Sequence, residues 1–79
     1  MNNLPPVASE NLLTLPRGPT SRLYVQLDTW DDGKRTVKIA TARPSVKGDI
    51  CRSVTIYPDE LRGIAIALAA AHKQMGLPV

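Results

Sequence analysis

Apolar and polar positions alternate in three stretches of the chain, residues 22–30, 35–42 and 50–57. A period of two is typical of strands with one covered face and one wet face. In the first two stretches the large aliphatic side chains occupy odd-numbered positions, which puts them on one face of a sheet. The intervening residues 31–33, Asp-Asp-Gly, have turn chemistry, so they predict a hairpin.

The third stretch contains one inconsistency, because Arg52 has the parity of the aliphatic Val54 and Ile56. Either a bulge precedes Ser53, or Arg52 lies at a frayed strand start. The preceding residues 44–49 read as a loop. A fourth strand is possible over residues 11–15, but the proline and glycine that follow weaken that alternative.

After Pro58 the apolar spacing changes to three and four, which predicts a helix over residues 58–75. Pro58 suits the first helical position, and Asp59 and Glu60 complement the positive end of the helix dipole. Gly76 suits the position just after the helix. The main apolar stripe of this helix needs a sheet to cover.

The chain of 79 residues is long enough for one domain. Because four of its seven prolines precede residue 20, residues 1–20 are expected to form a mobile arm. Residues 21–76 then form a β-β-β-α domain, and residues 77–79 form a tail. The expected fold class is α+β: an antiparallel sheet of three or four strands, followed by one C-terminal helix packed on one face.

The helix has a second face that is small or apolar where charge would be expected. The high helix propensity of alanine alone would explain these small residues, but a contiguous apolar patch favours a buried surface. A fold of this size also has a thin core. We therefore expect a homodimer, whose interface residues would be Gly63, Ile66, Ala67 and Ala70.

Catalysis is not expected, because the chain offers few reactive groups. His72 is interpreted as a packed side chain and Cys51 as a structural thiol. Asp31 and Asp32 are explained as turn formers. No metal site, cofactor or small-molecule substrate is predicted. With no signal peptide or membrane-length apolar run in the sequence, the expectation is a cytoplasmic protein without a membrane association.

Charge and aromatic residues indicate a different kind of site. Between residues 34 and 52, six basic residues accompany one acidic residue, and all three aromatic residues are expected on the outer, polar face of the sheet. Cations neutralise phosphates and aromatic rings stack on bases. The alternative is that these residues only solubilise the sheet. The candidate nucleic-acid-binding residues are Tyr24, Gln26, Trp30, Arg35, Lys38, Arg43, Lys47 and Arg52.

Three segments resemble a Pur-alpha repeat and the transcriptional positive cofactor four group: residues 22–28, residues 35–40 with the turn glycine before them, and residues 52–61 with their Asp-Glu-Leu end. With the Whirly proteins, these families form a superfamily of dimeric single-stranded nucleic-acid-binding proteins. The resemblance implies that the outward residues of the first two strands and the basic loop residues contact nucleic acid. Residues 40–43 depart from the positive cofactor pattern, because they lack its Arg-Glu-aromatic signature.

The expected function is therefore non-catalytic binding of single-stranded DNA or RNA by a dimer, in the regulation of transcription or replication. The alternative is a small regulator or inhibitor that docks on a larger nucleic-acid-processing protein, because Trp, Tyr and Arg also favour protein interfaces. The acidic residues around Trp30 favour this alternative.

Overall fold

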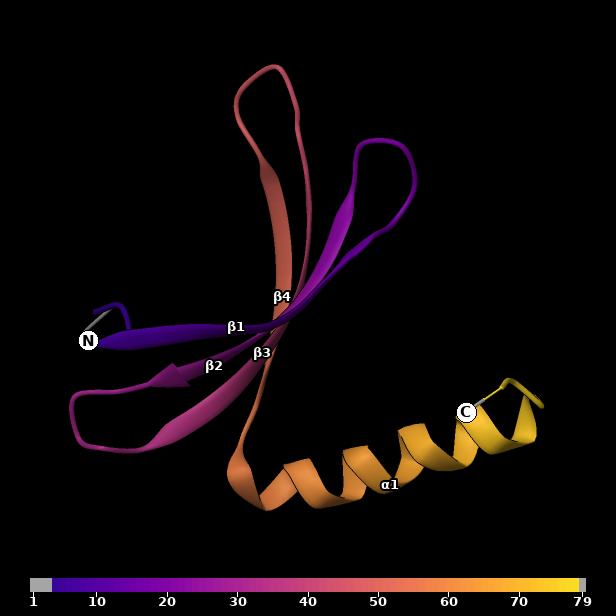
Figure 1. The fold of residues 1–79 in the computed structure, drawn as a ribbon. Coiled ribbons are helices and arrows are strands. Elements are labelled where there is room, and N and C mark those ends of the chain that lie inside the picture. The colour runs from indigo at the N-terminus through magenta and orange to yellow at the C-terminus, as the bar shows by residue number, and fades with distance from the viewer. Residues whose placement is uncertain (1–3, 79) are drawn as a thin grey trace.

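The computed structural model describes residues 4–78 and shows the expected α+β fold, with one antiparallel sheet followed by one C-terminal helix (Figure 1). The four strands form a meander, so that consecutive strands are neighbours in the order β1-β2-β3-β4. The elements are β1 Ala8–Pro16, β2 Arg22–Thr29, β3 Arg35–Arg43, β4 Ile50–Ile56 and α1 Pro58–Gln74.

The register of the central strands divides the sheet into two chemically distinct faces. Val25 pairs with Ile39 and Ile39 with Val54, so the large aliphatic residues of three strands lie together on what we call the apolar face. Lys38 pairs with Gln26 and Thr55 on the opposite side, which we call the small-residue face. The small-residue face comprises Tyr24, Gln26, Asp28, Thr36, Lys38, Ala40, Ala42, Ser53 and Thr55.

The predicted hairpin between β2 and β3 is present. Its loop is closed by the Trp30 N–H, which donates to the Lys34 carbonyl at 2.9 Å, and by the Gly33 N–H, which donates to the Trp30 carbonyl at 2.9 Å. Gly33 has a φ of 84°, a conformation in which a side chain would be strained. This three-residue loop sets the β2–β3 register and places Trp30 directly after β2.

The first strand corrects the prediction that residues 1–20 form a mobile arm. Residues 8–16 pair with β2, and a register shift between Asn11 and Leu13 leaves Leu12 as an extra residue. The bulge puts Leu13 opposite Val25, on the apolar face. Pro16 is tolerated because β1 is an edge strand, where a missing N–H breaks no interior ladder. The possible strand over residues 11–15 therefore exists and is longer than expected.

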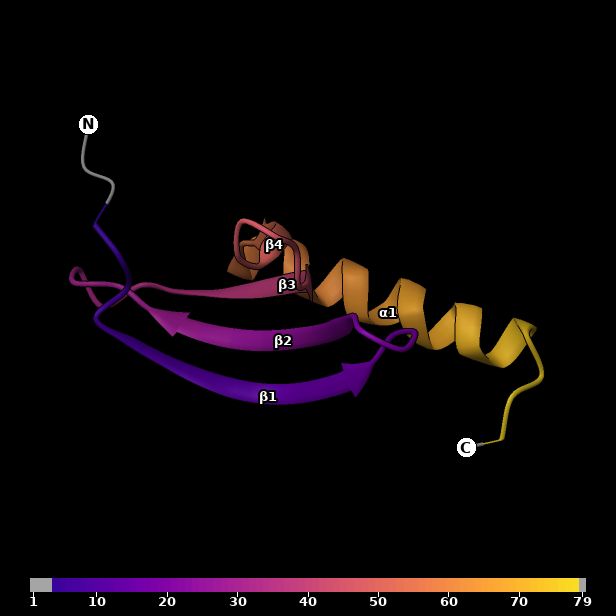
Figure 2. The ribbon, with the colours of Figure 1, turned by 90° about the horizontal axis from the view of Figure 1, so that it is seen from above.

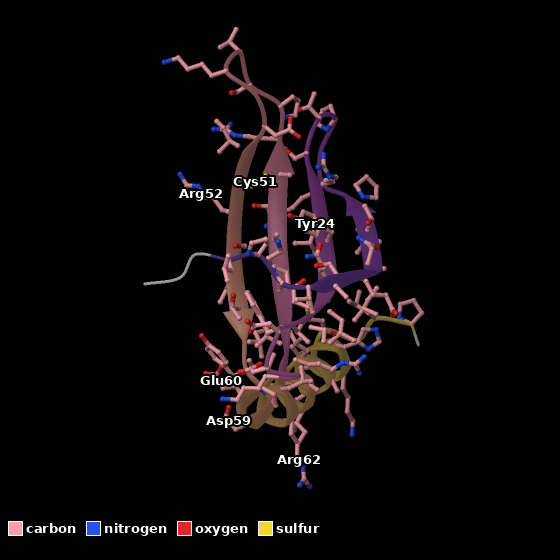
Figure 3. The ribbon with its side chains drawn as sticks, turned by 90° about the vertical axis from the view of Figure 1, so that its left-hand side faces the viewer. Tyr24, Cys51, Arg52, Asp59, Glu60 and Arg62 are labelled. Carbon is pink, nitrogen blue, oxygen red and sulfur yellow. The ribbon has the colours of Figure 1, made fainter. Side chains whose placement is uncertain are left out.

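Neither a bulge before Ser53 nor a frayed strand start explains the parity of Arg52. It lies inside a regular ladder, paired with Thr41, with no register shift between β3 and β4. Its side chain therefore belongs to the apolar face, at the sheet edge formed by β4, where it extends outward (Figure 3). An edge position allows this, because the guanidinium reaches water past the last strand.

The helix begins and ends close to the predicted positions. Tyr57 is the N-cap, and its N–H donates to the Glu60 carboxylate at 2.9 Å, which satisfies one free donor of the first turn. Asp59 and Glu60 lie in that first turn below the strand ends (Figure 3). Gly76 follows the last turn with a φ of 68°, as the sequence predicted for a helix C-terminus.

The contact between helix and sheet is confined to the beginning of α1. Leu61 borders a cavity with Leu27, Val37 and Ile56 on the apolar face, and Ile56 is buried there. Figures 1 and 2 show that α1 then runs past the strands, and no residue of 58–74 is fully buried. The main stripe expected to cover the sheet therefore remains largely exposed, and Leu68 is 61% exposed.

The molecule exposes much more surface than its mass requires. Its accessible area is 6623 Å², whereas a compact monomer of 8.6 kDa would expose about 4,700 Å². Its radius of gyration is 14.9 Å, against about 11.6 Å for a compact chain of this length. The excess, about 1,900 Å², reflects the uncovered apolar face and the projecting helix.

The best-buried side chains lie on the face expected to be wet. Ala40 and Ala42 are 2% and 1% exposed because their short side chains lie low between neighbouring strands. Asp28 is also buried, and its carboxylate accepts hydrogen bonds from Ser9 Oγ at 2.8 Å and Gln26 Nε2 at 2.7 Å. The bond from Ser9 ties β1 to β2 on the small-residue face, and the bond from Gln26 holds the carboxylate within β2.

We expect Asp28→Ala to lower the free energy of unfolding by about 1–3 kcal/mol, because the hydrogen bonds that its buried carboxylate accepts from Ser9 and Gln26 are lost. Urea denaturation followed by far-UV circular dichroism measures the change. Asp31→Ala removes a carboxylate of the same kind from an exposed loop position, so it should change stability by no more than about 0.5 kcal/mol. Equal effects of the two substitutions would contradict this role of Asp28.

Candidate nucleic-acid interface

The structure places half of the predicted binding residues together. Tyr24, Gln26 and Lys38 lie on the small-residue face of β2 and β3, where Gln26 and Lys38 are direct partners. Trp30 follows β2 and donates from its indole Nε1 to Thr36 Oγ1 at 2.9 Å, which fixes it at the end of the same face. These four side chains form the candidate interface.

Lys38 and Tyr24 interact directly within this interface. The Lys38 Nζ lies 5.8 Å from the centroid of the Tyr24 ring, a cation–π distance. Both residues are half-buried, so their exposed atoms face solvent above a floor of small side chains. Since Ala40 pairs with Tyr24 and Ser53 with Ala40, nothing large on β3 or β4 covers the ring from that side. A flat group and an anion could be accommodated here.

The predicted single cationic track does not form, because the arginines lie on the other side of the sheet. Arg35 pairs with Thr29 and donates from Nε to Thr29 Oγ1 at 3.3 Å on the apolar face. Arg43 and Arg52 have the same parity and lie farther along that face. The prediction treated nearness in sequence as nearness in space, whereas strand alternation separates Lys38 from all three.

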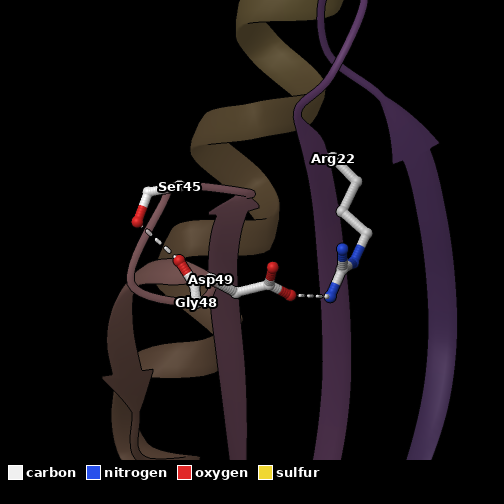
Figure 4. A network of polar contacts seen from close by, with 4 residues as sticks. All are labelled: Arg22, Ser45, Gly48 and Asp49. Atoms are coloured by element: carbon white, nitrogen blue, oxygen red, sulfur yellow. Dashed lines mark hydrogen bonds and ion pairs between the residues drawn. The ribbon is translucent and has the colours of Figure 1, made fainter.

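Lys47 lies in the loop between β3 and β4, at the end of the sheet opposite Trp30. Ser45 shapes this loop by donating from Oγ to the Gly48 carbonyl at 2.6 Å, and Asp49 pairs with Arg22 of β2 at 3.7 Å (Figure 4). The nine residues of β3 span about 30 Å. Lys47 and Trp30 therefore mark the two ends of the small-residue face rather than one cluster.

A cavity of about 450 Å³ opens beside Trp30, at the end of the sheet where β4 passes into α1. Its walls include Trp30 and Tyr57, and Thr36 and Thr55 lie between them. Sequence reasoning placed Tyr57 on the outer face but left it out of the binding site. The register of β4 against β3 could have indicated its role. Tyr57 directly follows Ile56, which pairs with Val37, so it lies at the same end of the sheet as Trp30. The remaining lining residues are Lys34, Arg35 and Pro58.

Cys51 is exposed and His72 lies on an exposed part of α1. Within residues 4–78, no three His, Cys, Asp or Glu side chains are grouped so as to hold a metal ion. No helix of the described region is both long enough and apolar enough to cross a membrane.

Comparisons of the chain with models of known protein families, with curated proteins and with solved structures found no match. The resemblance to the Pur-alpha, positive cofactor four and Whirly superfamily therefore stays a prediction that rests on the residues of the chain itself.

We expect Thr36→Val to destabilise the fold by about 1 kcal/mol, because the Trp30 N–H loses its acceptor while the side-chain volume is kept. Urea denaturation followed by Trp30 emission measures this. Thr55→Val is the matched control, since Thr55 lies on the same face and forms no side-chain hydrogen bond in the described part of the chain. A control as destabilised as Thr36→Val would show that the indole bond has no special role.

Proposed function

We propose that this protein binds single-stranded nucleic acid on the small-residue face and does so without catalysis, as a homodimer. The observation that supports this best is the Lys38 ammonium beside the Tyr24 ring on an uncovered surface. A ring can stack on a base while the cation meets the neighbouring phosphate, and each stacked base contributes about 1–3 kcal/mol. Trp30 extends the same surface toward the end of the sheet.

Two acidic groups near this face are engaged within the protein. Asp28 is 4% exposed and accepts two hydrogen bonds. Asp49 is paired with Arg22, which leaves Lys38 and Lys47 as the cations along the face. Two or three phosphate contacts are consistent with this arrangement, so the affinity should depend moderately on salt.

The direct test is fluorescence anisotropy with a labelled oligo-dT strand of about 12 nucleotides. Affinity should fall by about 7- to 20-fold between about 50 mM and about 200 mM salt, as expected for two or three phosphates on a single strand. Lys38→Gln and Tyr24→Leu should each weaken binding at low salt. Lys73→Gln removes a cation from the exposed end of α1 and is the matched control. Failure of the unmodified protein to bind at low salt would refute the function.

The dimer is supported by the surface that the protomer leaves uncovered. Stable obligate dimers bury about 2,000–5,000 Å² in total, and two chains that each expose about 1,900 Å² beyond a compact monomer fall in that range. The expected interface residues of α1, Gly63, Ile66, Ala67 and Ala70, are all exposed in the protomer. A second copy would also supply the burial that a small core lacks.

We expect Ala67→Glu to convert the dimer to monomers, because a carboxylate would be desolvated in an apolar contact. Sedimentation equilibrium at micromolar concentration measures the mass. Ala69→Glu is the control, since Ala69 lies on the helix side that carries Arg62 and Lys73. A monomer mass for the unmodified protein would rule out the dimer, and an unchanged mass for Ala67→Glu would rule out this interface.

A second function, docking on a larger protein, is favoured by the apolar face. This face carries Arg35, Arg43 and Arg52 around exposed aliphatic residues such as Val54, which is 56% exposed. Arginine at the rim of an apolar patch is typical of protein interfaces. A pull-down that survives nuclease treatment and is lost in Val54→Glu would favour docking over nucleic-acid binding.

A further inference from the structure

We propose that the cavity between Trp30 and Tyr57 is a subsite that takes one nucleobase of the bound strand, with a phosphate of that strand at Lys34. This inference rests on the proposed function and deepens it, because it adds Tyr57 and Lys34 to the site. It also distinguishes a pocket that encloses a base from the open platform at Tyr24 and Lys38.

The strand order creates the space between the two rings. Trp30 follows β2 and Tyr57 follows β4, so β3 separates them. The indole of Trp30 reaches toward Thr36 of β3, and the cavity of about 450 Å³ is lined by both Trp30 and Tyr57. Thr36 and Thr55 lie on the intervening part of the sheet, and their side chains are too short to fill the gap.

The fold fixes the indole of Trp30 and the backbone of Tyr57. The indole of Trp30 is fixed by its bond to Thr36 Oγ1, and residues 4–7 line a second cavity beside Trp30. That segment is itself held by the Val7 N–H, which donates to the Thr29 carbonyl at 2.8 Å. Tyr57 is fixed in its backbone by Glu60. A wall fixed in the way that Trp30 is loses little conformational entropy when a base stacks on it.

The chemistry of the lining suits a base more closely than an aliphatic group. Aromatic walls favour a π-face, and the exposed Thr55 hydroxyl can donate to or accept from the polar edge of a base. Lys34 and Arg35 border the same cavity. Lys34 lies 3.9 Å from Asp32 and is 82% exposed, so this weak pair leaves the ammonium accessible to a phosphate. The volume of about 450 Å³ lies within the range of ligand pockets.

Trp30 is the one tryptophan of the chain, so its fluorescence reports directly on this cavity. We expect an oligo-dT strand of about 12 nucleotides to quench Trp30 emission as it binds. A phosphodiester strand of equal length and charge without bases should bind more weakly and leave the emission unchanged. This comparison uses the unmodified protein, so its result does not depend on whether any variant folds.

Two substitutions of Tyr57 complete the test. Tyr57→Leu should weaken oligo-dT binding by about fivefold or more, the loss of one stacked base, and should reduce the quenching of Trp30. Tyr57→Phe keeps the ring and should bind within about twofold of the unmodified protein. Lys34→Gln should weaken binding, with a smaller dependence on salt.

The outcomes separate the subsite from the function on which it rests. If oligo-dT binds without quenching Trp30, or if Tyr57→Leu binds as the unmodified protein does, the subsite is wrong and strand binding elsewhere on the sheet stands. If the base-free strand quenches equally, the rings do not hold a base. If oligo-dT does not bind at all, both proposals are overturned together.

Discussion

The uncovered apolar face of the sheet is the constraint on which the rest of this structure depends. Three strands present aliphatic side chains on one side, and the chain supplies a single helix to cover them. That helix touches the sheet near Leu61 and then runs past it. At about 25 cal/mol per Å², leaving such a surface in water forfeits a large part of the stabilisation that a small domain needs. This deficit, more than any motif, is the physical basis of the proposed dimer.

Most elements could be predicted from local rules because local interactions determine them. The alternation of β2 and β3, the Asp-Asp-Gly turn with Gly33 at positive φ, and the Pro58 start of α1 are all visible within a few residues. The same rules did not predict β1 with its full length, because Leu12 forms a bulge that interrupts the alternation of this strand. An edge strand also tolerates Pro16, which in an interior strand would argue against pairing.

The direction of the helix could not be predicted in the same way. The apolar stripe that includes Leu61, Ile64 and Leu68 is compatible with a helix lying across its own sheet or across another chain. Periodicity fixes which side chains share a face, but the angle at which the chain leaves β4 through Tyr57 and Pro58 decides what that face meets. In this structure Leu61 meets the sheet and Leu68 does not.

The division of the basic residues shows a similar limit. A run of cations between residues 34 and 52 looks like one surface in sequence, but alternation sends Lys38 to one face and Arg35, Arg43 and Arg52 to the other. The aromatic residues were placed better, because Tyr24 and Trp30 share the parity of the small-residue face. Alternation placed Tyr57 on the same face, but its position beside Trp30 depends on the pairing of β4 with β3, which no local pattern contains.

The two faces can serve two different partners because their side chains differ in size as well as polarity. Ala40, Ala42 and Ser53 leave a shallow floor on the small-residue face, so a ring such as Tyr24 stays accessible beside its cation. On the apolar face, long aliphatic chains and edge arginines form a surface that is stabilised most when another protein surface removes it from water. A second copy on the apolar face would leave the small-residue face of both protomers open. The proposed dimer and the proposed strand binding are then compatible, since each would use the face that the other leaves free.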